Sequence, residues 1–396
     1  MLSFLLKFRL IMFKRILKLP LDQQNSIFLF GPRGTGKTSW LKKHLPDALY
    51  FDLLDFSLYQ SLSAYPNRLD NLIPPGYNNW IIIDEVQRIP ELLNEVHRLI
   101  EHKKYKFILT GSSARSLRRS GVNLLAGRAL RYTMHPLVIQ ELDDVFNLKK
   151  AIEFGLLPSV IEHPDPKKYL ESYVQTYIRE EVLFEGLTRN IGNFSRFLEV
   201  ASFSQGQVLN TTEISRELGI NRLTVANYFD ILDDLLLGIR ISAFSQRAKR
   251  KIIAHQKFYF FDAGVYNALR PVGPLDSREE LNGAALETLF FQSLSAVNDY
   301  YGYDYKIYFW RTLVGDEVDF VIYGPRGFYA FEIKRAASIN NKALSGLKKF
   351  GDDYPEAQLY ILFLGNQKEY YGNITAIPFE TALKELPHII KSSRIN

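Results

Sequence analysis

The segment from Gly31 to Thr38 reads GPRGTGKT and fits the pattern G-x-x-x-x-G-K-[ST], in which each position has a physical reason. Glycines let backbone N–H groups point inward around phosphates, the lysine reaches the β and γ oxygens, and the threonine hydroxyl binds magnesium. The apolar run IFLF before the segment predicts a strand, and SWLKKHL after it predicts a helix. This order predicts a parallel α/β sheet that binds ATP and Mg²⁺. The residues that we expect to bind the nucleotide are Gly31, Pro32, Arg33, Gly34, Thr35, Gly36, Lys37, Thr38 and Ser39.

A second motif, WIIIDEVQ at residues 80–87, supplies the acids that such a site needs. Its apolar residues predict a buried strand, and Asp84 at the strand end is expected to hold magnesium together with Thr38. Glu85 is expected to orient and deprotonate the attacking water. The alternative is that the two acids cap the helix predicted for the residues that follow. A further predicted strand, ALYFDL, lies between the two motifs along the chain and places the acids on the third strand.

The strand KFIL leads into Thr110-Gly111-Ser112, so the Thr110 hydroxyl is expected to sense the γ-phosphate from the neighbouring strand. The segment LLAGRAL follows, and its Arg128 is our candidate for an arginine that acts on the nucleotide of a neighbouring subunit. Arg118 and Arg119 are the reserve candidates. Such an arginine implies a homo-oligomer, of which a hexameric ring is one form. The alternative is that these arginines are solvated surface residues.

The composition is that of a folded globular protein, with 46% apolar and 23% charged residues. A length of 396 residues predicts two or three domains. The chain has no cysteine, which excludes disulfides, iron–sulfur clusters, thiolate zinc sites and thiol catalysis. The net charge of +6 mildly favours an acidic partner such as nucleic acid.

The N-terminal segment MLSFLLKFRLIMFKRILKL is apolar, but Lys7, Arg9, Lys14 and Arg15 interrupt it and no small-residue cleavage site follows. It is interpreted as an amphipathic lead-in, with Met12 as an alternative start, and a peripheral membrane anchor is the competing interpretation. No later segment reaches the roughly 18 apolar residues of a membrane span. These features predict a cytoplasmic protein without a membrane span.

Residues 211–237 predict two helices joined by a tight turn. Thr211 or Thr212 is expected to cap the first helix, Gly219 to end it, and Asn221 to begin the second. The residues expected to pack between the helices are Leu218, Ile220 and Val225.

GIRISAF and KFYFFDA predict two strands after these helices, and the basic loop between them predicts the wing of a winged helix. Phosphate contacts by such a loop position a protein on DNA without specifying sequence. Against DNA binding, the second helix carries three aspartates, Asp230, Asp233 and Asp234, and one basic residue, Arg222. The alternative is a lid or a protein-contact module. The wing side chains expected to contact DNA are Arg247, Lys249, Arg250 and Lys251.

The C-terminal part predicts a helix over residues 283–297 and then the strands YKIYFWRT, DEVDFVIY and GFYAFEIKR. Residues two apart on a strand share a face, so Glu332 and Lys334 point the same way, and Asp319 on the preceding strand can face them. Glu287 lies on an otherwise apolar side of the helix. Carboxylates beside a lysine predict a nuclease-like site with a second divalent metal, Mg²⁺ or Mn²⁺, and the alternative is a solvated hairpin. The expected metal ligands are Glu287, Asp319 and Glu332, and the expected catalytic residues are Asp319, Glu332 and Lys334.

In this order, the phosphate loop, DEVQ, LTGSSAR, LAGRA, the helix pair with its wing, and VDF…FEIK resemble a large prokaryotic family of AAA-type ATPases. That family has a C-terminal PD-(D/E)xK-like domain of unknown function. The resemblance covers about Phe13 to about Phe379, and it departs from ordinary AAA+ proteins in having Thr-Gly-Ser where an asparagine sensor is common.

The resemblance implies an α/β fold in several parts. These are an AAA+ P-loop parallel sheet, a helical lid, a winged-helix domain, and a restriction-endonuclease-like α/β domain. The expected boundaries are 1–22 for the lead-in, 23–136 for the ATPase core, 137–192 for the lid, 193–269 for the winged helix and 270–396 for the nuclease-like domain.

Two functions fit this organisation. The first is an ATP-driven enzyme that acts on or binds DNA, with the C-terminal domain cutting or gripping it. The second is a signalling ATPase whose winged-helix and nuclease-like domains only bind partners. ATP turnover that responds to DNA would favour the first, and turnover without a DNA effect would favour the second. A structural protein that does not hydrolyse ATP conflicts with Lys37, Asp84 and Glu85.

Overall fold

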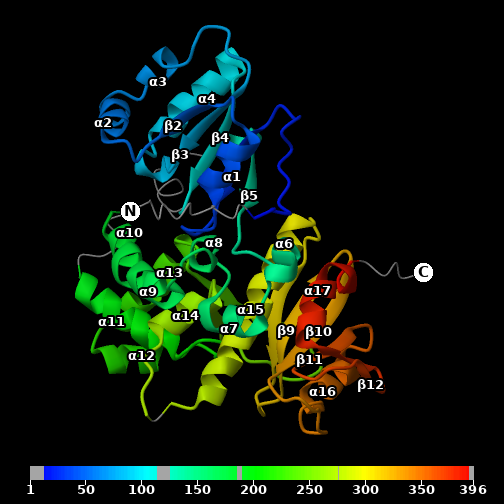
Figure 1. Cartoon of the computed structure of the whole chain (residues 1–396). Helices are drawn as coiled ribbons and strands as arrows, with labels where there is room; N and C mark the ends of the chain where they lie inside the picture. Colours follow the sequence, from blue (N-terminus) through cyan, green and yellow to red (C-terminus); the bar gives the residue numbers. More distant parts are fainter. Residues whose placement is uncertain (1–12, 114–124, 185–189, 275, 392–396) are drawn as a thin grey trace, which may run out of the picture.

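The computed structural model describes residues 13–113, 125–184, 190–274 and 276–391. The alternative start at Met12 and the reserve arginines Arg118 and Arg119 therefore lie outside the described residues. Figure 1 shows a sheet flanked by helices at the top, a group of helices below it on one side, and a second sheet below it on the other. Among the described residues, no helix has the length and apolar character needed to cross a bilayer.

The upper body is built on a five-stranded sheet in which every pairing is parallel, as predicted. The strand order is β2-β3-β4-β1-β5, so β4 separates the phosphate-loop strand β1 from the acid strand β3. The acids therefore stand on the third strand of the chain, also as predicted. The strands are β1 (Ser26–Phe30), β2 (Leu49–Asp52), β3 (Trp80–Asp84), β4 (Lys106–Gly111) and β5 (Ala129–Thr133).

Each face of this sheet has its own hydrophobic core. Ile27 of β1 packs into the core that contains α1 (Lys37–His44), and its neighbour Phe28 packs into the core that contains α4 (Leu92–Lys103). Both faces are covered, which explains why β1 is apolar at successive positions instead of at alternate ones. The shorter helices of this body are α2 (Phe56–Ala64), α3 (Arg68–Asn71), η1 (Val86–Arg88) and η2 (Leu125–Gly127).

The second body is mainly helical, and one continuous hydrophobic core runs through it from Leu157 to Ala285. This core joins the helices after the first sheet to the predicted helix pair and to the strands that follow the pair. The elements before the helix pair are α6 (Ile139–Leu142), η3 (Asp143–Val145), α7 (Leu148–Phe154), α8 (Pro158–Ile161), α9 (Pro166–Ser172), η4 (Tyr173–Ile178), α10 (Arg179–Phe184) and α11 (Ile191–Ser202).

The helix pair consists of α12 (Thr211–Leu218) and α13 (Arg222–Asp234). Gly219 has φ +66° and ends α12, and Asn221 accepts the N–H of Leu223 at 2.7 Å at the start of α13, as predicted. The predicted cap of α12 is wrong, because Asn210 accepts the N–H of Glu213 at 3.2 Å and Thr211 is already helical. The remaining elements of this body are the antiparallel strands β6 (Gly238–Ile241) and β7 (Lys257–Phe260), and α14 (Ala263–Leu269).

The third body has a six-stranded mixed sheet in the order β12-β13-β11-β10-β9-β8. The predicted helix over 283–297 lies within the longer α15, which packs with α17 on one face of this sheet, while α16 covers the other. Its elements are α15 (Arg278–Tyr300), β8 (Lys306–Arg311), β9 (Glu317–Gly324), β10 (Gly327–Lys334), α16 (Ser345–Asp353), β11 (Gln358–Phe363), β12 (Glu369–Tyr371), β13 (Ile374–Pro378) and α17 (Phe379–Ile389).

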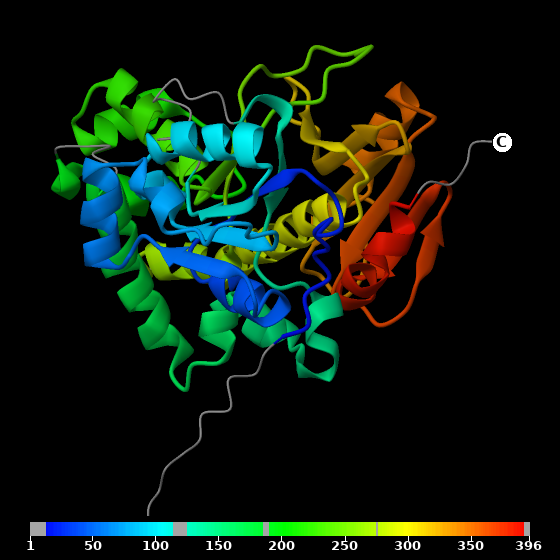
Figure 2. The same cartoon turned by 90° about the horizontal axis from the view of Figure 1, so that it is seen from above.

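The loop between β6 and β7, residues 242–256, lies against the third body. Phe244 of this loop is buried in the core beside α16, and Ala243 and Ile252 form single β-bridges to the β8 region. Arg250 donates to Asp353 at 2.8 Å, and Lys249 donates to the carbonyl oxygen of Asp352 at 3.1 Å. Two of the four basic side chains predicted to contact DNA therefore already have protein partners. Figure 2, from above, shows this green loop reaching toward the yellow and orange strands.

Candidate nucleotide site and carboxylate cluster

The phosphate loop connects β1 to α1 and depends on its glycines. Gly34 and Gly36 have φ of +83° and +89°, a region that a side chain disfavours. A Cβ at Gly31 would lie 2.3 Å from the carbonyl oxygen of Met134. The three glycines therefore fix a tight loop at the N-terminus of α1, where backbone N–H groups favour anions.

Lys37 is the first residue of α1 and is only 6% exposed. Its ammonium donates to the carbonyl oxygens of Gly31 at 2.7 Å and Pro32 at 3.3 Å. Burial lowers the pKa of Lys37 from its ordinary value, and the carboxylates of Glu85 and Asp84 oppose this shift. The ammonium is thus held within the loop that is predicted to surround the phosphates.

Asp84 stands at the end of β3, is 3% exposed, and receives three hydroxyl groups. Thr38 donates to its Oδ2 at 2.7 Å, Tyr50 donates to the same oxygen, and Thr110 donates to Oδ1. The predicted magnesium ligands Thr38 and Asp84 therefore meet, although one comes from α1 and the other from β3. A carboxylate beside a hydroxyl is an oxygen-only donor set, which fits Mg²⁺.

Glu85 follows β3 with φ +59°, a left-handed conformation that turns the chain sharply after the strand. Its N–H donates to the Thr110 hydroxyl at 3.3 Å, so the predicted sensor residue touches both acids. Gln87 donates from Nε2 to Glu85 Oε2 at 2.5 Å and to Ser112 Oγ at 3.0 Å. Glu85 makes no side-chain cap at η1, and α4 begins later at Leu92, so the alternative interpretation of the acids as a helix cap is wrong.

Besides Tyr50 and Gln87, three contributors to this region from other parts of the chain were not predicted from the sequence. Ser112 hydrogen-bonds to Glu181 of α10, and the negative charge of Glu181 also opposes the lowering of the Lys37 pKa. Tyr173 donates its hydroxyl to the carbonyl oxygen of Arg33 at 3.1 Å. The third is Arg15. Each comes from a segment distant in the chain, so local patterns around the motifs gave no signal for it.

Arg15 is buried, with 4% of its side chain exposed, and it joins several parts of the chain. It donates to the carbonyl oxygen of Thr35 in the phosphate loop at 2.6 Å and to the carboxylate of Glu141 in α6 at 3.0 Å. It also donates to the carbonyl oxygen of His135 at 2.6 Å and to the hydroxyl of Tyr300 in α15 at 2.8 Å. The phosphate loop and the long helix of the third body are thus connected through one guanidinium group.

Arg128 lies immediately before β5 and pairs with Glu101 at the end of α4. The register pairs Ser26 with Ala129, whereas Phe30, next to the phosphate loop, pairs with Thr133. Arg128 is therefore at the opposite end of the sheet from the phosphate loop of its own chain. This position does not test the prediction that it acts on a neighbouring subunit.

In the third body, the predicted carboxylates and lysine come together around β9 and β10. Lys334 donates to Glu332 Oε1 at 2.5 Å, the N–H of Asp319 donates to Glu332 Oε2 at 3.3 Å, and the N–H of Ile333 donates to Asp319 Oδ2 at 2.8 Å. Glu287 of α15 accepts a hydrogen bond from the Tyr259 hydroxyl at 3.2 Å. Burial, followed by repulsion from Asp319, raises the pKa of both Glu287 and Glu332 to about 8.

Lys257 and Glu317 belong to this cluster but were not among the predicted site residues. Lys257, the first residue of β7, is 1% exposed and pairs with Glu317 of β9, and its Nζ lies 3.7 Å from Asp319 Oδ1. The only sequence signal is a lysine at the start of the otherwise apolar strand KFYF. Within the part of the chain that the structure describes, no group of three or more His, Cys, Asp or Glu side chains is arranged to hold a metal ion. The predicted ligands Glu287, Asp319 and Glu332 thus do not form such a group.

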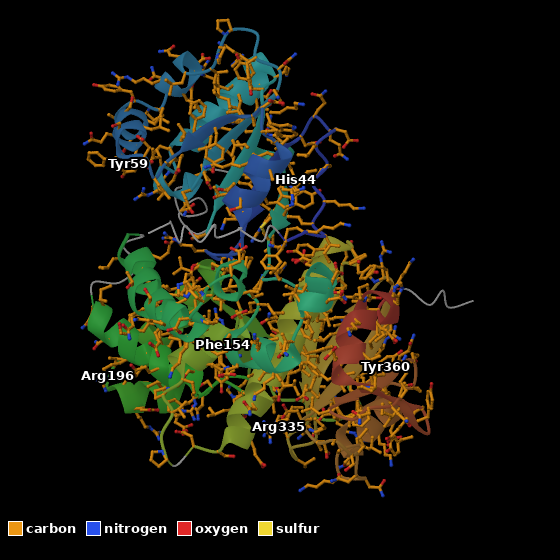
Figure 3. All side chains as sticks on the ribbon, in the orientation of Figure 1. His44, Tyr59, Phe154, Arg196, Arg335 and Tyr360 are labelled. Carbon is orange, nitrogen blue, oxygen red and sulfur yellow. The ribbon has the colours of Figure 1, made fainter. Side chains whose placement is uncertain are left out.

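The cluster lies where the second and third bodies meet. Arg335, which follows Lys334 at the end of β10, is marked in Figure 3 beside the lower end of α15, where it pairs with Glu279 at 3.5 Å. A cavity of about 390 Å³ opens onto Glu287 from the α11–α14 side and is lined by Gln205 and Arg270 among others. Among the carboxylates of the cluster, Glu287 therefore lines this cavity.

Comparisons with known proteins divide the chain into three parts. Residues 23–143 match the family model of an AAA domain. Residues 145–276 and 282–382 match two domains of unknown function, DUF8612 and DUF4143. Together with the parallel sheet and the phosphate loop, the first match identifies an AAA-type P-loop domain in this chain.

Two curated relatives align with most of the chain. An uncharacterized protein of Mycobacterium tuberculosis is 24% identical over 370 residues, which cover 90% of this chain and 80% of that protein. An uncharacterized protein of Methanocaldococcus jannaschii is 24% identical over 330 residues, covering 75% and 71% respectively.

Structural comparison gives matches to two solved structures, both at low TM-scores. The Aeropyrum pernix ORC1 protein in complex with DNA gives a TM-score of 0.30 at 13% identity, over 62% of this chain and 86% of that one. Protein VC1899 from Vibrio cholerae gives a TM-score of 0.22 at 13% identity, over 92% and 97%. At these TM-scores, neither structure carries an argument about function.

Proposed function

We propose that this chain hydrolyses ATP with magnesium in the site between α1, β3 and β4. The observation that carries the proposal is the 2.7 Å contact between Thr38 and Asp84, which brings the phosphate loop and the acid strand to one point. A glycine-rich turn without a function would not require a buried carboxylate from another strand beside its threonine. The AAA-domain match over residues 23–143 supports the same conclusion.

In this proposal the loop N–H groups and Lys37 bind the phosphates, and Thr38 and Asp84 would hold Mg²⁺. When bound, magnesium neutralises charge on the phosphate oxygens. Glu85 orients the attacking water and accepts its proton. Gln87 positions Glu85 through its 2.5 Å hydrogen bond, and Thr110 links Glu85 to Asp84. Arg128 of a neighbouring copy would stabilise the transition state in a homo-oligomer.

The test compares Glu85→Gln with Lys37→Ala. Glu85→Gln keeps the shape of the side chain but removes the base, so nucleotide should bind as in the wild type while turnover falls by about 10²-fold or more. Lys37→Ala should lose nucleotide binding, because the phosphates lose their cationic partner. Binding of a fluorescent ATP analogue and release of phosphate measure the two steps separately. Equal turnover by the wild type and Glu85→Gln would remove Glu85 from the mechanism.

DNA is the partner that we propose for the ATPase, on the basis of the acid-free segment between Asp234 and Asp262 and its exposed loop. The loop is also docked on the third body through Arg250 and Lys249. DNA binding must therefore use the exposed remainder of these side chains or release the loop.

The competing function is a nucleotide-driven switch that acts between the parts of the chain, which the contacts of Arg15 and Tyr173 to the phosphate loop favour. ATP turnover measured with and without single-stranded, duplex and branched DNA separates the two. A change in rate that weakens with salt supports action on DNA, and an unchanged rate supports the switch.

A further inference from the structure

The acidic cluster of the third body receives a cation from outside that body. Lys257 belongs to β7, which pairs with β6, and its backbone also bridges to Val208. Its side chain extends to β9, where it pairs with Glu317 and lies 3.7 Å from Asp319. Almost none of Lys257 is exposed. Its backbone is held by β6 and its ammonium by Glu317, so this charge is not a mobile surface charge.

Every carboxylate of the cluster already has a partner in the protein. Lys257 pairs with Glu317 and Asp319, and Lys334 pairs with Glu332 at 2.5 Å. Glu317 is also 3.2 Å from Arg311, and Glu287 accepts the Tyr259 hydroxyl at 3.2 Å. Three cationic side chains, Lys257, Lys334 and Arg311, thus face four carboxylates, so at most one negative charge is left uncompensated.

A divalent cation bound between Asp319, Glu332 and Glu287 would lie beside the Lys257 ammonium. The cation and the ammonium would repel each other strongly, because both would be buried and little water would screen their charges. Access does not keep a cation away, since the cavity of about 390 Å³ reaches Glu287. The fixed ammonium is the feature of this cluster that opposes a metal.

We propose that the Lys257 ammonium takes the place of a divalent cation, so that Glu287, Glu317, Asp319 and Glu332 form a metal-free ionic lock between the β6–β7 hairpin and the C-terminal sheet. The lock joins the second body to the third at the same interface as the docked loop 242–256. It is independent of the proposed ATPase, because the cluster shares no residue with the nucleotide site. In this proposal, the nuclease-like arrangement of Asp319, Glu332 and Lys334 holds the second and third bodies together.

The experiment measures Mn²⁺ binding to the nucleotide-free full chain by electron paramagnetic resonance. The variants are Lys257→Met, which keeps the length of the side chain without its charge, and Lys251→Met, a matched control on the exposed loop. Each variant is also measured with the second substitution Glu332→Gln. Only Mn²⁺ binding that this substitution abolishes is assigned to the cluster, because Mn²⁺ bound at Thr38 and Asp84 does not depend on Glu332. Circular dichroism and a cooperative thermal transition verify that each variant is folded.

We expect the wild type and Lys251→Met to show no Mn²⁺ binding that depends on Glu332. Lys257→Met should gain about one ion per chain with at least tenfold higher affinity, and Lys257→Met/Glu332→Gln should lose it again. Glu332-dependent binding by the wild type as tight as that of Lys257→Met would overturn the proposal, and so would a folded Lys257→Met that gains no ion.

If Lys257→Met does not fold, the melting temperature of the wild type in Mn²⁺ and in EDTA decides the matter. A value that is unchanged, or that rises equally in the wild type and in Glu332→Gln, supports the lock. A rise in Mn²⁺ that Glu332→Gln abolishes refutes it. Loss of ATP hydrolysis in the wild type would contradict the proposed function and leave this result unaffected.

Discussion

Replacing Arg15 with methionine is expected to destabilise the protein strongly, because it removes one partner of a buried ion pair. The exposed fractions of the two side chains are 4% for Arg15 and 0% for Glu141. Burial raises the pKa of Glu141 even with the guanidinium beside it, so the carboxylate depends on Arg15 to remain charged. Breaking a buried pair by removing one partner costs about 3–5 kcal/mol, and the carbonyl oxygens of Thr35 and His135 also lose their donor.

A double-mutant cycle tests this origin of the loss. Glu141→Gln keeps an oxygen that can accept the N–H of Ile16, which now donates at 2.8 Å, but it removes the charge. In Arg15→Met/Glu141→Gln no charge is stranded, so the double variant should be more stable than Arg15→Met alone, with a coupling of about 1–3 kcal/mol. Arg15→Lys keeps a charge but loses the forked geometry, and it should fall between the wild type and Arg15→Met.

The assay is urea unfolding followed by tryptophan fluorescence, since Trp40 and Trp80 both lie in the core on one face of the first sheet. A loss below about 1 kcal/mol for Arg15→Met would refute the reasoning. Losses that simply add in the double variant would also refute it, since the two side chains would then act independently.

Three further predictions concern other parts of the chain. Mixing Arg128→Ala with Lys37→Ala should restore part of the ATP turnover, because a mixed interface pairs one intact loop with one intact arginine; unaffected turnover in Arg128→Ala alone would contradict this. Burial raises the pKa of Asp262 to about 6, so the folded protein favours the protonated side chain. The stability that this group contributes is fully present below about pH 4, near the ordinary pKa of aspartate, and is lost as the pH rises through about 6. Relative to the wild type, Asp262→Asn should therefore gain up to about 3 kcal/mol between pH 4 and pH 7 in urea unfolding, and a pH-independent difference would contradict this. Changing Lys249, Arg250 and Lys251 together to alanine should weaken DNA binding equally across sequences. The slope of log affinity against log salt concentration should become flatter by about 2–3 units.

The first sheet could be predicted from the sequence because its signals are local. A strand that is buried on both faces is apolar throughout, and IFLF and WIII are short runs that end at Gly31 and Asp84. The convergence of Thr38 and Asp84 follows, since the carboxyl ends of parallel strands share one edge. The cap of α12 was missed by one residue, because Asn210 and Thr211 are both good caps and only the backbone geometry separates them.

Glu181, Arg15 and Lys257, which sequence analysis missed, have one property in common: each acts on a segment far away in the chain. Glu181 reaches Ser112 across 69 positions, and Arg15 reaches Tyr300 across 285. Periodicity and spacing describe neighbours on one strand or helix, so they cannot pair charges on elements that meet only after folding. The local pattern therefore brought Asp319, Glu332 and Lys334 together correctly, but it gave no sign of the Lys257 ammonium, which comes from another body.

The same reasoning explains why a nuclease-like pattern is compatible with two different roles. Alternation along a strand places Glu332 and Lys334 on one face whatever the cluster does, so the pattern by itself does not distinguish a metal site from an ionic lock. The distinction depends on the charge that faces the carboxylates from the adjoining body. Here that charge is a buried ammonium, held by a strand whose other residues are aromatic and which pairs with β6. Movement of the β6–β7 hairpin away from β9 would withdraw the Lys257 ammonium from Glu317 and Asp319. In the proposed lock, this movement would open the cluster to cations.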